Sequence, residues 1–163
     1  MPSWTIWLWG RRPLVTLLRA AVLGTLLYVI GRYAFLPVHV AGLSMEPTIH
    51  DGTWRIGNKL KFLSREPQRG DLVMIRMAGW HAYYLKRVLG LPGETLAFTN
   101  GALLINGRVV PEPYLAGGSD WSLPPTRVPQ GEYFVAGDNR AVPLPAHMAG
   151  LTRRSAIAVG LLW

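Results

Sequence analysis

The chain has 163 residues, with 17 Lys and Arg against 9 Asp and Glu, and its net charge of +8 favours an anionic partner such as nucleic acid, lipid headgroups or an acidic protein. Half of the residues are hydrophobic and 16% are charged, which excludes a disordered chain and indicates contact with lipid or a partner protein. Because the sequence has no cysteine, disulfides, thiolate catalysis and thiolate metal sites are excluded.

The first predicted element is an apolar helix near the N-terminus. Residues 14–36 are apolar except for Arg19 and Arg32, and at about 1.5 Å per residue a helix of this length spans the hydrocarbon core of roughly 30 Å. Both arginines lie towards its ends, where long side chains reach the headgroups. We therefore expect a transmembrane anchor at 14–36. An amphipathic helix packed on the domain is the alternative, and a cleavable signal peptide is disfavoured because no small-x-small cleavage site follows.

Basic residues predict the orientation of this anchor. Arg11, Arg12 and Arg19 favour an N-terminus in the cytoplasm under the positive-inside tendency. Residues 1–13 would then be a cytoplasmic segment, and residues 37–163 would face outward. The pattern predicts a single-pass protein of the cell (inner or plasma) membrane whose main domain lies on the outer (periplasmic or extracytoplasmic) side.

Residues 37–163 predict a β-rich domain. Short runs of β-branched and aromatic residues alternate with Gly, Pro, Asn and Asp. Asn-Gly pairs at 100–101 and 106–107 are typical of hairpin turns and indicate a meander. The segment 117–126, "GGSDWSLPPT", lacks periodicity and is expected to be a loop. The expected strands are 71–75, 82–90, several within 94–110, 132–137 and 156–162.

The sequence contains no pattern typical of a metal, nucleotide or nucleic-acid site. Its four histidines, His39, His50, His81 and His147, are scattered without ligand spacing, so neither a metal nor a cofactor is expected. The basic residues form no clustered face or recognition motif, which argues against a nucleic-acid partner.

Ser44 lies in "AGLSMEPTIHDGT", residues 41–53, a few residues beyond the predicted anchor. A serine hydroxyl is a poor nucleophile at neutral pH unless a nearby base takes its proton. No histidine has a context that suggests a Ser-His-Asp arrangement, and a plain surface loop is the alternative for a lone serine. Lysine is the other base that this chain offers.

Lys86 differs in context from the other two lysines. Lys59 and Lys61 lie in the polar stretch "GNKLKF", whereas Lys86 lies in "AYYLKRVLG", where period-two alternation puts it on one strand face with Tyr84 and Val88. Full burial lowers the pKa of a lysine by up to roughly 3–5 units, so that a neutral amine can act as a base. The alternative is an edge-strand lysine whose amine reaches solvent.

Four motifs in order carry a resemblance to a known family. "GLSMEPTIHDGT" is similar to its nucleophile box, "RGDLVMI" to its next strand, "YLKRVLGLPGE" to its lysine box and "AGDNR" to the start of its last box. The chain thus resembles the type I signal peptidases, membrane-anchored serine proteases with a Ser/Lys dyad. The resemblance implies a mainly β fold, a compact β-barrel-like domain of antiparallel sheets behind one transmembrane helix. It also implies that Ser44 is the nucleophile and Lys86 the general base in removing signal (leader) peptides from exported preproteins.

The resemblance implies roles for further residues. The Ser44 backbone N–H would form the oxyanion site, with Gly42 and Met45 beside it, and Arg87 and Asp138 would form an ion pair that supports the lysine strand. The substrate would bind as an added strand against Val38, Val40, Tyr84 and Leu85, with plain core packing as the alternative for the aliphatic three.

The last box departs from the family pattern. The family continues with a serine, an aspartate and an arginine before a glycine, whereas this chain has Pro143, Pro145 and His147 before Gly150. The hydrogen bond that the family's serine gives to the lysine is therefore lost, or supplied by another group such as Tyr84 or a backbone carbonyl. The prolines disfavour a regular strand there.

Two alternatives to a general signal peptidase follow from this departure. One is a catalytically weak or silent membrane-tethered relative that binds extended peptides, and the other is a specialised maturation peptidase of pilin or conjugation systems. The expected partners are preprotein signal peptides and membrane lipid, without nucleic acid, and the oligomeric state is left open.

Overall fold

The computed structural model describes residues 12–76, 83–147 and 149–162 and divides into two compact units that meet between Phe35 and Leu36. The described part of the first unit contains helix α2 (Pro13–Ala34), with a proline in its first turn, where the missing N–H breaks no helical hydrogen bond. Its 22 residues give a length of about 33 Å, and it is long and apolar enough to cross a membrane. The helix ends at Ala34, two residues before the predicted end, because Phe35 takes an extended conformation and begins a strand.

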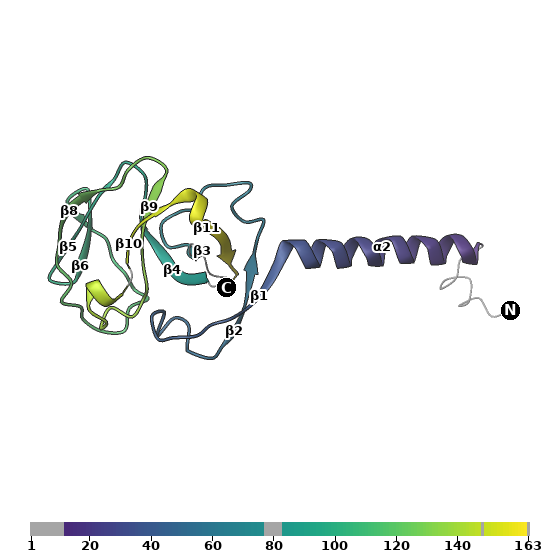
Figure 1. Cartoon of the computed structure of the whole chain (residues 1–163), viewed down its shortest axis with the longest axis horizontal. Helices are drawn as coiled ribbons and strands as arrows, with labels where there is room; N and C mark the ends of the chain where they lie inside the picture. Colours follow the sequence, from purple (N-terminus) through teal and green to yellow (C-terminus); the bar gives the residue numbers. More distant parts are fainter. Residues whose placement is uncertain (1–11, 77–82, 148, 163) are drawn as a thin grey trace. The chain divides into compact units, whose positions relative to one another are not determined.

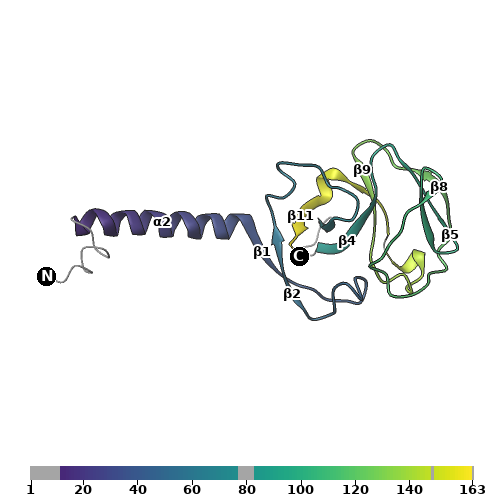
Figure 2. The same ribbon diagram turned by 180° about the vertical axis from the view of Figure 1, so that it is seen from behind.

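The second unit consists of two antiparallel sheets, so the predicted mainly β class is confirmed (Figure 1). The larger sheet has seven strands in the order β1-β2-β11-β3-β4-β9-β10, and the smaller has four in the order β7-β6-β5-β8. Seen from both sides, β5 and β8 lie at one end of this domain and β2, β4 and β11 towards the other (Figure 2). The strands are β1 (Phe35–His39), β2 (Trp54–Asn58), β3 (Leu72–Arg76), β4 (Tyr83–Gly90), β5 (Thr95–Thr99), β6 (Ala102–Ile105), β7 (Arg108–Val109), β8 (Leu123–Arg127), β9 (Glu132–Ala136), β10 (Gly150–Arg153) and β11 (Ile157–Leu161).

The predicted meander is confirmed as β5, β6 and β7. Both Asn-Gly pairs form the tight turns between these strands, with Asn100 at φ 47° and Gly101 at φ 79°, and Asn106 at φ 51° and Gly107 at φ 78°. Two successive positive φ values define the turn that matches the twist of a hairpin, and Asn and Gly adopt them at low cost.

The expected loop at 117–126 is confirmed as far as residue 122 and is wrong beyond it. Its C-terminal part belongs to strand β8, which pairs with β5 at the edge of the smaller sheet, where Pro124 and Pro125 are tolerated. Trp121 is 2% exposed and packs on Phe98 with ring centroids 5.3 Å apart. Strands β1, β2 and β10 were not expected either, since their short sequences lack a clear alternation.

Three hydrophobic clusters form the interior. The first joins the two sheets, with Leu89 and Phe134 of the larger sheet against Phe98 and Leu103 of the smaller. The second fills the centre of the larger sheet around Val73 and Val88. The third consists of Val40, Met45, Ile49, Leu72 and Leu161, and it packs beneath the segment that carries Ser44. The position of Ser44 is therefore set by core packing as well as by hydrogen bonds.

Candidate active site

Ser44 lies on a turn that is fixed on both sides. The Val40 N–H donates to the carbonyl of Thr53 at 2.9 Å, and the Gly52 N–H donates to the carbonyl of Val40 at 2.9 Å, which closes the loop 40–53. Met45 and Ile49 anchor the turn in the third hydrophobic cluster, while Ser44 itself is only partly buried. A partly exposed hydroxyl on an anchored turn suits a nucleophile.

A groove of about 350 Å³ opens beside Ser44, within the usual size range of ligand sites. One wall comes from the chain that leads to Ser44 and the other from β3 and β4. Its lining includes all four predicted substrate-binding residues, which are Val38, Val40, Tyr84 and Leu85. Gly42, Ser44 and Met45 also line it. Val38 and Leu85 also pack on the third cluster, so they serve both groove and core.

Lys86 is a buried lysine, 3% exposed, on the central strand β4. It faces Val73 across β3, and continuing the register of β4 with β9 by one residue places it opposite Gly137. Burial lowers the pKa of the Lys86 amine, and the negative charge of Asp138 opposes that effect only in part. Among the described residues, no hydrogen bond joins Ser44 Oγ to Lys86 Nζ.

The segment after β9 connects the lysine strand to the serine turn. The Asn139 N–H donates to the Ser44 carbonyl at 3.1 Å, and Asn139 Nδ2 donates to the Leu43 carbonyl at 3.0 Å. Gly137 lies so close to the Ser44 carbonyl that a Cβ atom there would clash with it. The absence of a side chain at Gly137 thus allows the two segments to approach, although Gly137 follows β9 without any local sign of this role.

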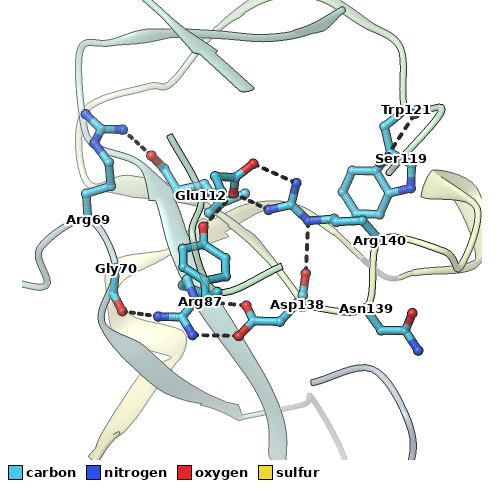
Figure 3. Close-up of polar contacts among 12 residues, drawn as sticks. Arg69, Gly70, Arg87, Glu112, Ser119, Trp121, Asp138, Asn139 and Arg140 are labelled. Atoms are coloured by element: carbon cyan, nitrogen blue, oxygen red, sulfur yellow. Dashed lines mark hydrogen bonds and ion pairs between the residues drawn. The ribbon is translucent and has the colours of Figure 1, made fainter. Parts of the chain in front are cut away.

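Arg87 and Asp138 form a buried, two-pronged ion pair (Figure 3). Arg87 Nε donates to Asp138 Oδ1 at 2.8 Å and Arg87 Nη2 to Oδ2 at 2.5 Å, while the Thr48 hydroxyl donates to the same Oδ2 at 2.5 Å. Arg87 also donates to the Gly70 carbonyl and lies over the ring of Tyr114. Asp138 therefore connects the lysine strand to the serine turn through Thr48.

A second buried ion pair, Arg140 with Glu112, lies beside the first (Figure 3). Arg140 Nε donates to the Gly137 carbonyl at 3.1 Å, and its guanidinium lies 4.8 Å from the centroid of the Trp121 ring. Tyr114 donates its hydroxyl proton to Glu112, and burial together with this hydrogen bond raises the pKa of Tyr114. The sequence offers no local signal for this pair, because its members are 28 positions apart, with strands β8 and β9 between them.

The other predicted residues have varied surroundings. Gly42 is at φ 101°, in the region that favours glycine, and its N–H donates to Asp51 Oδ1 at 2.7 Å. Met45 is 1% exposed and belongs to the third cluster. Within the described ranges, no three His, Asp or Glu side chains are grouped as metal ligands, and His81 lies outside those ranges.

Comparison with known proteins gives consistent matches. A family model described as signal peptidase, peptidase S26, matches residues 14–161. A Signal peptidase I from Bacillus amyloliquefaciens is 37% identical over 146 residues, covering 83% of this chain and 72% of the relative. Signal peptidase I T from Bacillus subtilis (strain 168) is 37% identical over 142 residues, covering 81% of this chain and 70% of the relative. The solved structure of a signal peptidase I from Enterococcus faecalis V583 is 26% identical, with a TM-score of 0.48, and covers 61% of this chain and 98% of that one.

Proposed function

The chain belongs to the signal peptidase family, peptidase S26, and on that premise we propose that it is a membrane-anchored serine endopeptidase that removes signal peptides, with Ser44 as nucleophile and Lys86 as general base. The observation that carries the proposal is the burial of Lys86, which lowers the pKa of its amine, on the strand whose neighbouring residues line the groove at Ser44. Only a neutral amine can accept a proton, and burial favours that form.

The chemistry proceeds by acyl transfer. The neutral Lys86 amine accepts the Ser44 hydroxyl proton as Oγ attacks the carbonyl carbon of the scissile peptide bond. The ammonium then protonates the leaving amine, and an ester joins Ser44 to the signal peptide. Water hydrolyses this ester with Lys86 again as the base. The backbone N–H of Ser44 is the candidate donor to the oxyanion, since the Gly42 N–H already binds Asp51.

The groove favours an extended peptide with small side chains as the substrate. Its walls are aliphatic at Val38, Val40 and Leu85, and Tyr84 adds an aromatic side. Strand addition supplies backbone hydrogen bonds irrespective of sequence, while shallow apolar sites select side chains by size. Helix α2 would anchor the enzyme in the cell membrane, with the β domain on the outer side where exported preproteins emerge.

The test is cleavage of a panel of preproteins by the detergent-solubilised full chain and by the variants Ser44→Ala and Lys86→Met. Either substitution should lower kcat at least about a thousandfold, because the nucleophile and its base act as a unit. Cleavage by the unmodified chain should rise with pH between about pH 6 and about pH 10, as Lys86 loses its proton.

Matched controls are Ser64→Ala and Lys59→Met, which change the same residue types outside the groove and should leave kcat unaltered. Retained cleavage in Ser44→Ala or Lys86→Met would show that another pair performs the reaction. If the unmodified chain binds these preproteins without cleaving them, the silent peptide-binding alternative is correct. The replacement of the family's lysine-orienting serine by Pro143 favours that alternative.

A further inference from the structure

His147 is a buried histidine beside the lysine strand, 2% exposed. The prolines of the altered last box place it there: Pro143 precedes the 3-10 turn η1 (Leu144–Ala146), and the His147 N–H donates to the Leu144 carbonyl at the end of that turn. Its ring meets the Trp121 ring edge-on, with centroids 4.8 Å apart. The departure from the family pattern thus brings an imidazole into the interior.

The hydrogen bonds of His147 select one form of the ring. The Gly137 N–H donates to Nδ1 at 3.3 Å, so Nδ1 carries no proton. Nε2 lies 3.0 Å from the Asn139 carbonyl, which can only accept, so Nε2 carries the proton. Both bonds therefore require the neutral imidazole with its proton on Nε2.

The surrounding charges agree with this neutral form. Burial is the main factor that lowers the pKa of His147 to about 4, and the positive charges of Lys86 and Arg140 act in the same direction. The Asn139 carbonyl and the negative charge of Asp138 oppose them without restoring the ordinary value. The ring is consequently neutral at pH 7.

The two residues that His147 binds are those that connect Ser44 to Lys86. Asn139 holds the Ser44 carbonyl through its N–H, and Gly137 is the residue opposite Lys86 in the continued register of β4 and β9. A Cβ atom at Gly137 would clash with both the Ser44 carbonyl and the His147 ring. Gly137 binds His147 through its N–H, and its carbonyl accepts a hydrogen bond from Arg140 Nε, which belongs to the network shown in Figure 3. A small displacement of this segment would move the serine relative to the lysine.

We propose that His147 is a positioning residue of this site, whose neutral imidazole fixes segment 137–139 through its two ring nitrogens and thereby holds the Ser44 peptide in register with the strand that carries Lys86. His147 is not among the residues that line the groove. The proposal rests on the function proposed above. In the family, a serine orients the lysine by a hydrogen bond. His147 would instead position the serine turn and the lysine strand through the backbone of Gly137 and Asn139.

The test compares two variants of the full chain in detergent, with a cleaved preprotein as substrate. His147→Phe keeps a ring of similar size against Trp121 and removes both hydrogen bonds, whereas His147→Gln keeps one donor and one acceptor. The Phe variant should lose about tenfold or more in kcat, since small misplacements of reacting groups reduce rates strongly, with KM changed less than about twofold. The Gln variant should recover most of the lost kcat.

Lys59→Met is the control, because Lys59 lies outside the groove and outside the loop that carries Ser44, and it should leave kcat and KM unaltered. Three results would each overturn the proposal. The first is an unchanged kcat in His147→Phe, and the second is an effect of that substitution on KM alone. The third is a folded His147→Gln variant that is as slow as His147→Phe. Nitrogen-15 NMR of the wild-type imidazole decides independently of how the variants fold: a neutral ring with its proton on Nε2 at pH 7 is expected, and a charged ring or a proton on Nδ1 overturns it. If the unmodified chain cleaves no preprotein, the proposed function is refuted, but the NMR measurement of the His147 ring still tests its form.

Discussion

At the scale of the single residue, the burial of Lys86 should lower the stability of the fold. Its folded-state pKa lies below the ordinary value of 10.5, mainly because burial disfavours the charged amine. The unfolded chain therefore binds more protons between these two pKa values, and stability rises with pH across that window. We expect Lys86→Met to have the higher free energy of unfolding at neutral pH, with the difference shrinking as pH rises through the lowered pKa towards 10.5.

Urea unfolding of the two proteins at a series of pH values measures this difference. Lys59→Met, which removes a lysine that is not fully buried, should track the unmodified chain at every pH. A Met variant that is less stable at pH 7 would show that Lys86 gains more from its charged neighbours than it loses by burial.

The burial of Lys86 could be predicted from the sequence, because strand alternation and its apolar neighbours are local signals. The sequence also placed Ser44 a few residues beyond the apolar segment 14–36. The contributions of His147, Asn139 and Thr48 could not be predicted in this way. Thr48 and Asn139 act through hydrogen bonds to residues distant in sequence, 90 positions between Thr48 and Asp138 and 96 between Asn139 and Leu43. His147 binds residues 8 and 10 positions away, but no periodic pattern in the sequence indicates that the chain turns back to bring them together.

At the scale of the element, the two Asn-Gly turns of the meander provide a matched pair of substitutions. Gly101 and Gly107 have nearly equal φ values, 79° and 78°, so alanine is strained equally at both. A Cβ at Gly101 would clash with the backbone of Ser119, whereas nothing lies within 4 Å of a Cβ at Gly107. Gly101→Ala should therefore cost about 1–3 kcal/mol more stability than Gly107→Ala, the usual range for overpacking.

Equilibrium unfolding of both variants alongside the unmodified chain measures this difference. The Gly107 variant serves as the control for backbone strain, since it has the same conformation without the close neighbour. Equal losses in the two variants would mean that the 119–121 segment moves away at little cost.

Two of the strands that were missed, β8 and β10, differ physically from the predicted strands β4 and β5. β4 and β5 are central in their sheets and have continuous apolar or alternating sequences. β8 contains two prolines and β10 has only four residues. Both lie at sheet edges and pair with one neighbouring strand only, so they tolerate prolines and lack a strong alternating pattern. Edge strands of this kind are specified by their neighbours more than by their own residues.

At the scale of the whole molecule, the domain is stabilised by hydrophobic clusters together with buried or partly buried charges. Asp71 binds Arg65 at 2.7 Å and Lys61 at 3.1 Å near the start of β3. Burial raises the pKa of Asp71, but hydrogen bonds from Arg65, the Gln68 N–H and Lys61 outweigh it and bring the pKa to about 2. His147, buried as a neutral ring, has its pKa lowered to about 4. These two groups titrate in separate ranges and should give acid unfolding two distinguishable parts.

The signs follow from which state binds more protons. His147 has a folded pKa of about 4 against an ordinary 6.5, so its contribution is complete above pH 6.5 and is lost as pH falls towards 4. Asp71 has about 2 against 3.8, so its contribution is lost between those values. As pH falls from 6.5 to 4, titration of His147 should lower the free energy of unfolding by up to about 1.4 kcal/mol per pH unit, and we expect His147→Gln to remove this slope. We expect Asp71→Asn to reduce the corresponding slope below pH 3.8. Urea unfolding at half-unit pH steps measures both slopes, and an unchanged upper slope in His147→Gln would show that the imidazole is already charged or exposed in the folded protein.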